Sequence, residues 1–125
     1  MDWSFDNSIP IYAQLVQQFK LAIVSGEFKC GEKLPGVRDF AAQAGVNPNT
    51  MQRAFAELER LGLVYTQRGD GRYVTEDASA INGMKNTLAE EQTLKYISSM
   101  LALGFGTEQI LLWINKVTEE ENGNL

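Results

Sequence analysis

The chain has 125 residues, 44% of them hydrophobic, which suffices for one small domain with an appendage but not for two full domains. Histidine is absent and Cys30 is the single cysteine, so we expect no metal site, no cofactor and no internal disulfide. A Ser-His or Cys-His catalytic pair and a phosphate-binding loop are missing as well. The sequence therefore predicts that the protein is not an enzyme.

Acidic residues outnumber basic ones by 16 to 11, which is unfavourable for non-specific binding to nucleic acid. The acidic excess lies mostly after residue 76, so residues 1–76 are close to neutral. No apolar stretch approaches the roughly 18 to 20 residues of a membrane span, and the start, MDWSFDNSIP, is acidic where a secretion signal is basic. We therefore expect a cytoplasmic protein with no membrane association.

The first predicted helix follows Pro10, a residue suited to a first helical turn, and ends before Gly26. Its apolar residues recur at helical spacing: Tyr12, Leu15, Val16, Phe19, Ala22 and Ile23. Residues 27–35 contain a glycine and a proline and predict a loop, with a short strand at residues 32–34.

A helix-turn-helix is predicted next. Residues 37–44 form a short helix that Gly45 ends, and a second helix begins at Asn47, whose side chain is a good cap, with Pro48 in its first turn. The inward apolar stripe of this second helix consists of Met51, Ala54, Phe55, Leu58 and Leu61. Two helices joined by a short glycine-containing turn are the layout of a helix-turn-helix.

A β-hairpin follows the two helices. Residues 63–67 and 72–75 predict two strands, and Arg68-Gly69-Asp70-Gly71 between them predicts a tight turn. The predicted fold class is therefore mainly α with a small β-hairpin wing. We place this winged helix-turn-helix in residues 1–76.

Residues 77–125 return to a helical pattern and predict a two-helix region. One long helix ends at Gly104-Phe105-Gly106, and a last helix begins at Thr107. Two helices cannot bury all of their apolar residues on each other, so the remainder either docks on the winged helix or pairs with a second copy. We expect a homodimer through Leu94, Ile97, Leu101, Phe105, Ile110, Trp113 and Ile114. Two helices enclose little volume for a ligand, so a dimer core is the better interpretation of these residues than an effector pocket. A small-molecule effector stays possible, but the sequence does not identify one.

Several linked motifs resemble the GntR family of bacterial regulators: PIYAQL, then GEKLPGVRDFAAQAGVNPNTMQRAFAELERLGLVYTQRGDGRYV. The short two-helix tail looks like that of the YtrA subfamily, which uses it to dimerise. The resemblance implies a sequence-specific, DNA-binding transcription regulator without enzymatic activity. We expect a repressor that binds double-stranded DNA at a palindromic operator as a homodimer.

The second helix of the predicted helix-turn-helix supplies candidate DNA contacts, because its apolar stripe faces inward and its other residues face out. Gln52 suits adenine, and Arg53 suits guanine or a phosphate. Asn47, Asn49 and Thr50 are better placed for phosphate at the helix N-terminus, where Pro48 is also exposed. The alternative is that Asn47 only caps the helix and the others form an ordinary solvated face.

The resemblance adds Arg38 in the first helix of the motif, with Arg68, Gly69 and Arg72 over the adjacent minor groove. A surface salt bridge to Asp39 or Glu32 is the alternative for Arg38. A redox role for Cys30 is the weaker interpretation of that thiol, since Lys29 is its one basic neighbour in the sequence.

Two positions depart from the family pattern. Gly36 stands where the family usually has a serine, which would cap the following helix and contact phosphate. Asp70 lies in the wing where many relatives have a basic or neutral residue, and its charge is unfavourable beside DNA. We expect both departures to affect DNA affinity more than function.

Two other functions fit parts of the sequence. A winged helix used as a protein-interaction module without specific DNA binding would explain the acidic balance. A truncated regulatory domain of a larger enzyme, as in aminotransferase-fused GntR members, predicts a missing C-terminal domain, and the chain's own helical tail argues against it.

Overall fold

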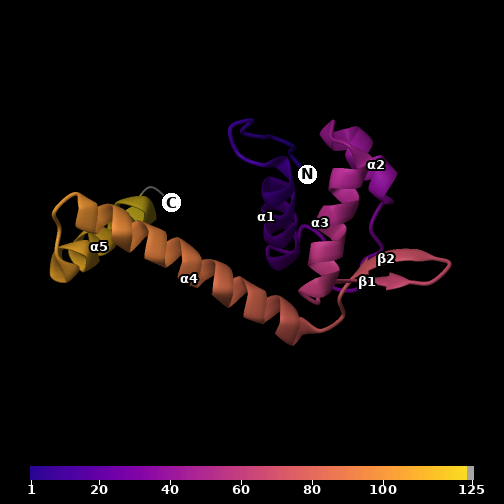
Figure 1. Cartoon of the computed structure of the whole chain (residues 1–125). Helices are drawn as coiled ribbons and strands as arrows, with labels where there is room; N and C mark the ends of the chain where they lie inside the picture. Colours follow the sequence, from indigo (N-terminus) through magenta and orange to yellow (C-terminus); the bar gives the residue numbers. More distant parts are fainter. Residues whose placement is uncertain (124–125) are drawn as a thin grey trace. The chain divides into compact units, whose positions relative to one another are not determined.

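Residues 1–123 are described by the computed structural model, and they form five helices and one two-stranded sheet (Figure 1). The chain divides into two units, the first being Met1–Lys85 and the second beginning at Asn86. The first unit contains α1 (Ile11–Val24), α2 (Val37–Ala44), α3 (Pro48–Arg60), β1 (Val64–Gln67) and β2 (Gly71–Val74). Helix α4 (Ala78–Ala102) begins in the first unit, and α5 (Thr107–Gly123) belongs to the second.

The core of the first unit lies where the first three helices meet. Phe19 of α1 contacts Phe40 of α2 and Phe55 of α3, with ring centroids 5.2 and 4.9 Å apart. These three side chains are fully or almost fully buried, as the helical spacing of the sequence predicts. Helix α2 ends at Gly45, whose φ of 68° is a left-handed conformation that favours glycine.

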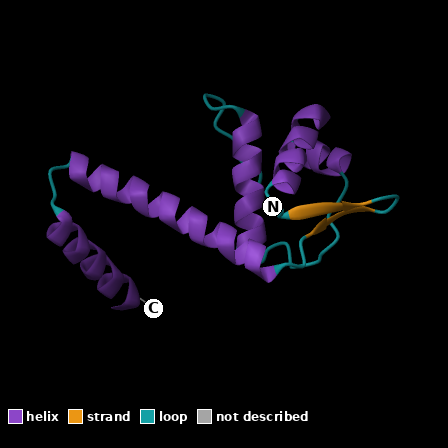
Figure 2. Ribbon diagram, turned by 60° about the horizontal axis from the view of Figure 1, so that its bottom comes forward, coloured by secondary structure: helices purple, strands orange, loops and turns teal. Residues whose placement is uncertain are grey.

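The hairpin is antiparallel, with Val64 opposite Val74 and Tyr65 opposite Tyr73. Figure 2 shows the two strands reaching away from the helices to a loop at the tip. The short strand predicted at residues 32–34 is reduced to a single bridge between Lys33 and Tyr73. Pro35 follows it directly and has no N–H group, so the pairing cannot extend in that direction.

Helix α4 begins at Ala78, directly after Asp77, whose Oδ1 accepts a hydrogen bond from the backbone N–H of Ser79 at 2.9 Å. Ile81 and Met84 of its first turns pack against the core of the first unit, which continues to Lys85. The division into functional regions at residue 76 stays a prediction. No single helix in residues 1–123 is both long and apolar enough to span a membrane, and α4 and α5 meet that test only when joined across a bend of 115°.

Candidate nucleic-acid interface

Helix α3 begins with the predicted cap. Asn47 is extended, and its Oδ1 accepts a hydrogen bond from the backbone N–H of Asn49 at 2.8 Å, with Pro48 in the first turn. The cap uses the side-chain oxygen of Asn47 and leaves its amide N–H groups for a further partner. The first turn of α3 thus presents backbone N–H groups and the positive end of the helix dipole to an approaching anion.

The two faces of α3 separate as predicted. Met51, Ala54, Phe55 and Leu58 of the apolar stripe are buried, whereas Leu61, also predicted in the stripe, follows the last residue of α3 and is half-buried. Pro48, Asn49, Gln52 and Arg53 are exposed, whereas Thr50 is half-buried. Thr50 borders a hollow of about 350 Å³ that Phe5, Asn7, Ile11, Gly45, Val46 and Asn47 complete. The exposed face therefore carries one arginine and several short polar side chains within its first two turns.

The arginines of the first unit fall into two groups. Arg60 and Arg72 pair with Glu57 and Glu59. Within residues 1–123, Arg38, Arg53 and Arg68 form no ion pair with a carboxylate, and all three are exposed. The alternative salt bridge of Arg38 to Asp39 or Glu32 is therefore not formed. Three of the four candidate arginines keep their charge available to an external anion.

Arg53 has an aromatic partner instead. Its guanidinium carbon lies 4.6 Å from the ring centroid of Tyr12, near the start of α1. Tyr12 is half-buried and Arg53 is exposed, so the contact lies at the edge of the exposed face of α3. A cation over an aromatic ring at this distance is attracted by the ring quadrupole.

Arg72, the fourth candidate arginine, is engaged inside the first unit. Its Nε donates to Glu59 Oε1 at 3.0 Å, and its guanidinium lies 5.4 Å from the ring centroid of Phe55. The Thr66 hydroxyl donates to the same Glu59 oxygen. Partial burial raises the pKa of Glu59, but the hydrogen bonds from Thr66 and Arg72 outweigh it and hold the pKa below its usual value. The Arg72 side chain is 22% exposed, and its contact with DNA stays a prediction.

The tip of the wing carries the remaining candidates. Arg68 and Gly69 are exposed, and Gly69 has a φ of 78°, a conformation that favours glycine and brings bare backbone to the tip. Asp70 accepts hydrogen bonds from the Tyr73 hydroxyl and from Lys33 Nζ, the latter at 2.9 Å. These two bonds, that of Tyr73 first, lower the pKa of Asp70. The acidic charge that departs from the family pattern is thus offset by Lys33.

Gly36 occupies the cap position of α2. Its backbone is extended, with φ −66° and ψ 159°, and α2 receives no side-chain cap hydrogen bond. A Cβ atom placed there would lie 3.7 Å from Asp39 Oδ2, an ordinary contact distance. The missing cap that the sequence predicts is confirmed, and the site has room for a serine.

The second unit exposes a large apolar surface. Of the candidate dimerisation residues, Leu94, Leu101, Trp113 and Ile114 are exposed by 40% or more, while Ile97 and Phe105 are half-buried. Ile110 is only 5% exposed within a single chain, so it contributes to the internal packing of the unit. Dimerisation through these residues stays a prediction.

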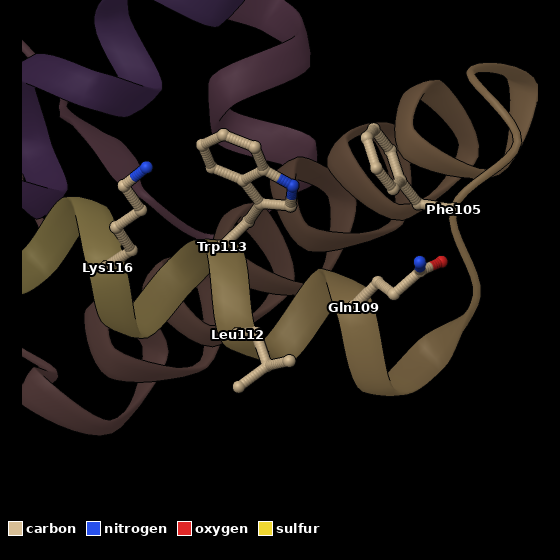
Figure 3. Close-up of a pocket in the computed structure, with 5 residues that line it drawn as sticks. All are labelled: Phe105, Gln109, Leu112, Trp113 and Lys116. Carbon is tan, nitrogen blue, oxygen red and sulfur yellow. The ribbon is translucent and has the colours of Figure 1, made fainter.

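One hollow on this surface has a volume of about 160 Å³ and is lined by Phe105, Gln109, Leu112, Trp113 and Lys116 (Figure 3). The rings of Phe105 and Trp113 meet edge to face at 6.3 Å, and Lys116 Nζ lies 4.8 Å from the ring centroid of Trp113. The volume is below the roughly 300 Å³ at which small-molecule sites begin. This hollow suits an inserted side chain better than an effector.

The sequence pattern misses four residues of the site. Tyr12 belongs by spacing to the apolar face of its helix, and Glu59, Lys33 and Tyr73 lie inside the family motifs but were given no role there. The charges of Glu59 and Lys33 were the signal available in the sequence. Their partners, Arg72 and Asp70, lie in other parts of the chain, so the sequence pattern does not pair them.

Cys30 donates from Sγ to the carbonyl of Thr75 at 3.2 Å. In residues 1–123, no group of three or more His, Cys, Asp or Glu side chains is arranged to hold a metal ion.

Sequence comparison extends along almost the whole chain. The chain is 41% identical over 119 residues to the uncharacterized HTH-type transcriptional regulator YhcF of Bacillus subtilis (strain 168), covering 95% of this chain and 98% of that protein. It is 38% identical over 119 residues to the HTH-type transcriptional repressor YtrA of the same organism, covering 94% of this chain and 91% of YtrA.

Two solved structures show related folds. A GntR family transcriptional regulator from Listeria monocytogenes has a TM-score of 0.84 and 45% identity, covering 90% of this chain and 98% of that chain. AraR(DBD) in complex with operator ORX1 has a TM-score of 0.55 and 26% identity, covering 60% of this chain and 96% of that chain. These likenesses confirm the winged helix-turn-helix fold, and the relatives are transcription regulators rather than enzymes. With the pattern of the family described as "Bacterial regulatory proteins, gntR family" matching residues 11–74, the chain belongs to the GntR family of transcription regulators.

Proposed function

We propose that the chain is a transcription repressor of the cytoplasm that binds a palindromic operator as a homodimer. In this proposal α3 enters the major groove, and the tip of the wing lies over the adjacent minor groove. The two copies place their α3 helices on successive major-groove faces, about 34 Å apart. Bound protein blocks transcription nearby.

The observation that carries the proposal is the set of uncompensated arginines. Arg38, Arg53 and Arg68 lie on α2, on α3 and at the wing tip, and none of them is neutralised by a carboxylate in residues 1–123. Their neighbours Arg60 and Arg72 are neutralised. A net charge of −5 makes non-specific attraction to DNA weak, so binding depends on these local charges and on the polar face of α3.

Roles for the individual side chains follow from their positions. Gln52 and Arg53 suit base edges in the major groove, because both are exposed beyond the first turn of α3. Asn47, Asn49 and Thr50, at the N-terminus of α3, suit a backbone phosphate. Arg38 suits a phosphate beside α2, and Arg68 and Gly69 suit the minor groove.

The dimer is supported by the apolar surface of the second unit. Leu103, Leu111 and Leu112 are each more than half exposed, in addition to the four exposed residues named above. So many large apolar side chains rarely stay in contact with water in a monomer. The relative YtrA is named a repressor, which supports that role for this chain.

Fluorescence anisotropy tests the proposal. The labelled duplex is the DNA directly upstream of the protein's own gene, and a scrambled duplex of the same composition is the control. Tight binding to the upstream duplex alone, weakened by Arg53→Ala, is the expected result, and circular dichroism should show that the Arg53→Ala chain is folded at the assay temperature. Equally feeble binding to both duplexes, followed by no enrichment from a genomic fragment library, would leave the protein-interaction module as the better account.

A further inference from the structure

We infer that Tyr12 is a specificity-determining residue, which orients the Arg53 guanidinium so that its edge reads a guanine in the operator. The inference rests on the proposed DNA-binding function and adds a residue of α1 to it. Tyr12 acts through Arg53 and is therefore a positioning residue, with no contact to a base of its own.

The Tyr12 ring covers one side of the Arg53 guanidinium group and leaves the other side exposed. The guanidinium carbon lies 4.6 Å from the Tyr12 ring centroid, so the Tyr12 ring supports one face of the guanidinium. Tyr12 is half-buried on α1, and α1 packs against α3 through buried residues such as Phe19 and Phe55. The ring thus sits on the folded core and not on a flexible loop.

Stacking and base reading use different parts of the guanidinium. The aromatic ring meets the planar face, whereas the N–H donors lie in the plane and point outward at the edge. Guanine presents two acceptors, O6 and N7, to a pair of such donors in the major groove. In our proposal the guanidinium presents its planar face to Tyr12, so it keeps its donors available while losing much of its freedom to rotate.

No carboxylate competes for Arg53 in the described part of the chain. Glu57 and Glu59, which follow on the same helix, are occupied by Arg60 and by Thr66 with Arg72. Arg53 is thus held by an uncharged partner that leaves its charge intact. Arg72 shows the contrasting arrangement, since its guanidinium also lies over an aromatic ring but pairs with Glu59.

Base discrimination measured with matched variants tests the inference. The probe is a fluorescein-labelled duplex carrying the sequence that the wild-type chain enriches most strongly from a random duplex library. A set of further duplexes replaces each G·C pair of that sequence in turn by A·T. Affinities are measured for the wild type, Arg53→Ala, Tyr12→Leu, Tyr12→Phe and the Tyr12→Leu/Arg53→Ala double variant.

Arg53→Ala should lose roughly 5- to 150-fold of discrimination at one G·C pair per half-site, the range for a bidentate contact. Tyr12→Leu should lose about two- to five-fold at that same pair, the range for an exposed cation–π contact. Tyr12→Phe keeps the ring and should match the wild type. In the Arg53→Ala background, Tyr12→Leu should change discrimination no further, because the two residues act through one contact.

A second measurement examines the contact without DNA. The Arg53 Cδ protons should show a ring-current shift in the wild type and Tyr12→Phe that is lost in Tyr12→Leu, with all three chains folded by circular dichroism. Absence of that shift in the wild type overturns the inference. So does a Tyr12→Leu chain that weakens binding to every duplex equally, because that pattern indicates a structural role.

Failure of the proposed function has a separate signature. If the wild-type chain enriches no sequence from the library, the DNA-reading role of Tyr12 falls together with the proposed function. If the wild type binds selectively, and Arg53→Ala relaxes selectivity while Tyr12→Leu does not, the inference alone is overturned.

Discussion

Arg72 of β2 and Glu59 of α3 form an ion pair, with 3.0 Å between Nε and Oε1, that joins the wing to the helix we propose to enter the major groove. The Thr66 hydroxyl of β1 donates to the same carboxylate, so both strands of the hairpin are tied to α3. Phe55 lies beneath the guanidinium, with its ring centroid 5.4 Å from the guanidinium carbon. The wing is thereby fixed relative to α3 by side chains as well as by its connecting backbone.

Arg72→Met should therefore act mainly on stability. The variant keeps much of the apolar stem but loses the charged hydrogen bond and the cation–π contact, and should lower the free energy of unfolding by about 1–2 kcal/mol. Chemical denaturation measures this loss. Arg68→Met is the matched control and should leave stability unchanged while reducing the salt dependence of DNA binding by roughly one phosphate. If Arg72→Met instead left stability unchanged and reduced the salt dependence of DNA binding, Arg72 would be a phosphate ligand.

The Glu59 cluster should also depend on pH. The folded-state pKa of Glu59 is lower than its usual value of 4.5, so the ionised carboxylate stabilises the fold above that value. This contribution should fall as the pH drops from 4.5 through the folded-state pKa, and Glu59→Gln should be less stable than the wild type at neutral pH. The difference between the two chains should shrink in acid, as measured by urea denaturation across that range. A constant difference would mean that charge at Glu59 is irrelevant.

Asp70→Asn should strengthen binding to DNA. The change removes a negative charge from the wing tip and releases Lys33, whose Nζ lies 2.9 Å from Asp70 Oδ1. The expected result is tighter binding to cognate and scrambled duplexes alike, with a salt slope steeper by roughly one phosphate. In the Asp70→Asn/Lys33→Met double variant, the dependence of DNA affinity on salt concentration should return to that of the wild type. Weaker binding by Asp70→Asn would instead show that orientation of the wing by Asp70 outweighs its charge.

Gly36→Ser should stabilise the first unit slightly. The backbone at Gly36 already has the extended conformation of a cap, and its φ of −66° suits any residue. A serine hydroxyl can accept a hydrogen bond from the first turn of α2, which favours Ser over Gly by only about 0.3 kcal/mol. Differential scanning calorimetry should show a small rise in unfolding temperature, and Gly36→Ala should not show it. An equal rise in both variants would point to lower backbone entropy of the unfolded chain.

Ile114→Asp should produce a monomer. Ile114 is 43% exposed on the apolar surface of α5, and a carboxylate there cannot be buried against a second copy at low cost. Analytical ultracentrifugation should show half the wild-type mass, and operator affinity should fall because two half-sites no longer bind together. Gln92→Asp adds the same charge at an exposed polar position of α4 and should leave the mass unchanged. A dimeric Ile114→Asp chain would exclude this surface as the interface.

Local sequence signals were sufficient for most of the fold. Helix α2 occupies residues 37–44 as predicted, because Gly45 ends it with a left-handed residue. Helix α3 begins after Asn47 for the predicted reason, a side-chain cap. Helix α4 begins at Ala78, directly after Asp77, whose Oδ1 accepts a hydrogen bond from the backbone N–H of Ser79. The strands lack such a signal: β1 begins one residue later than predicted, and β2 is shifted by one residue toward the N-terminus. Element ends without a cap or breaker are set by packing, which a local pattern does not contain.

The sequence by itself determined which residues of α3 face outward, since helical periodicity turns Gln52 and Arg53 away from a buried stripe. Only the tertiary structure decided which partners Arg53 and Arg72 meet on other elements. Arg53 meets Tyr12 of α1, and Arg72 meets Glu59 of α3, because the core packs these elements side by side. The physical reason is that a side chain selects its partner from what lies within a few ångströms in space, and for charges on different elements that distance is set by the packing of the whole unit.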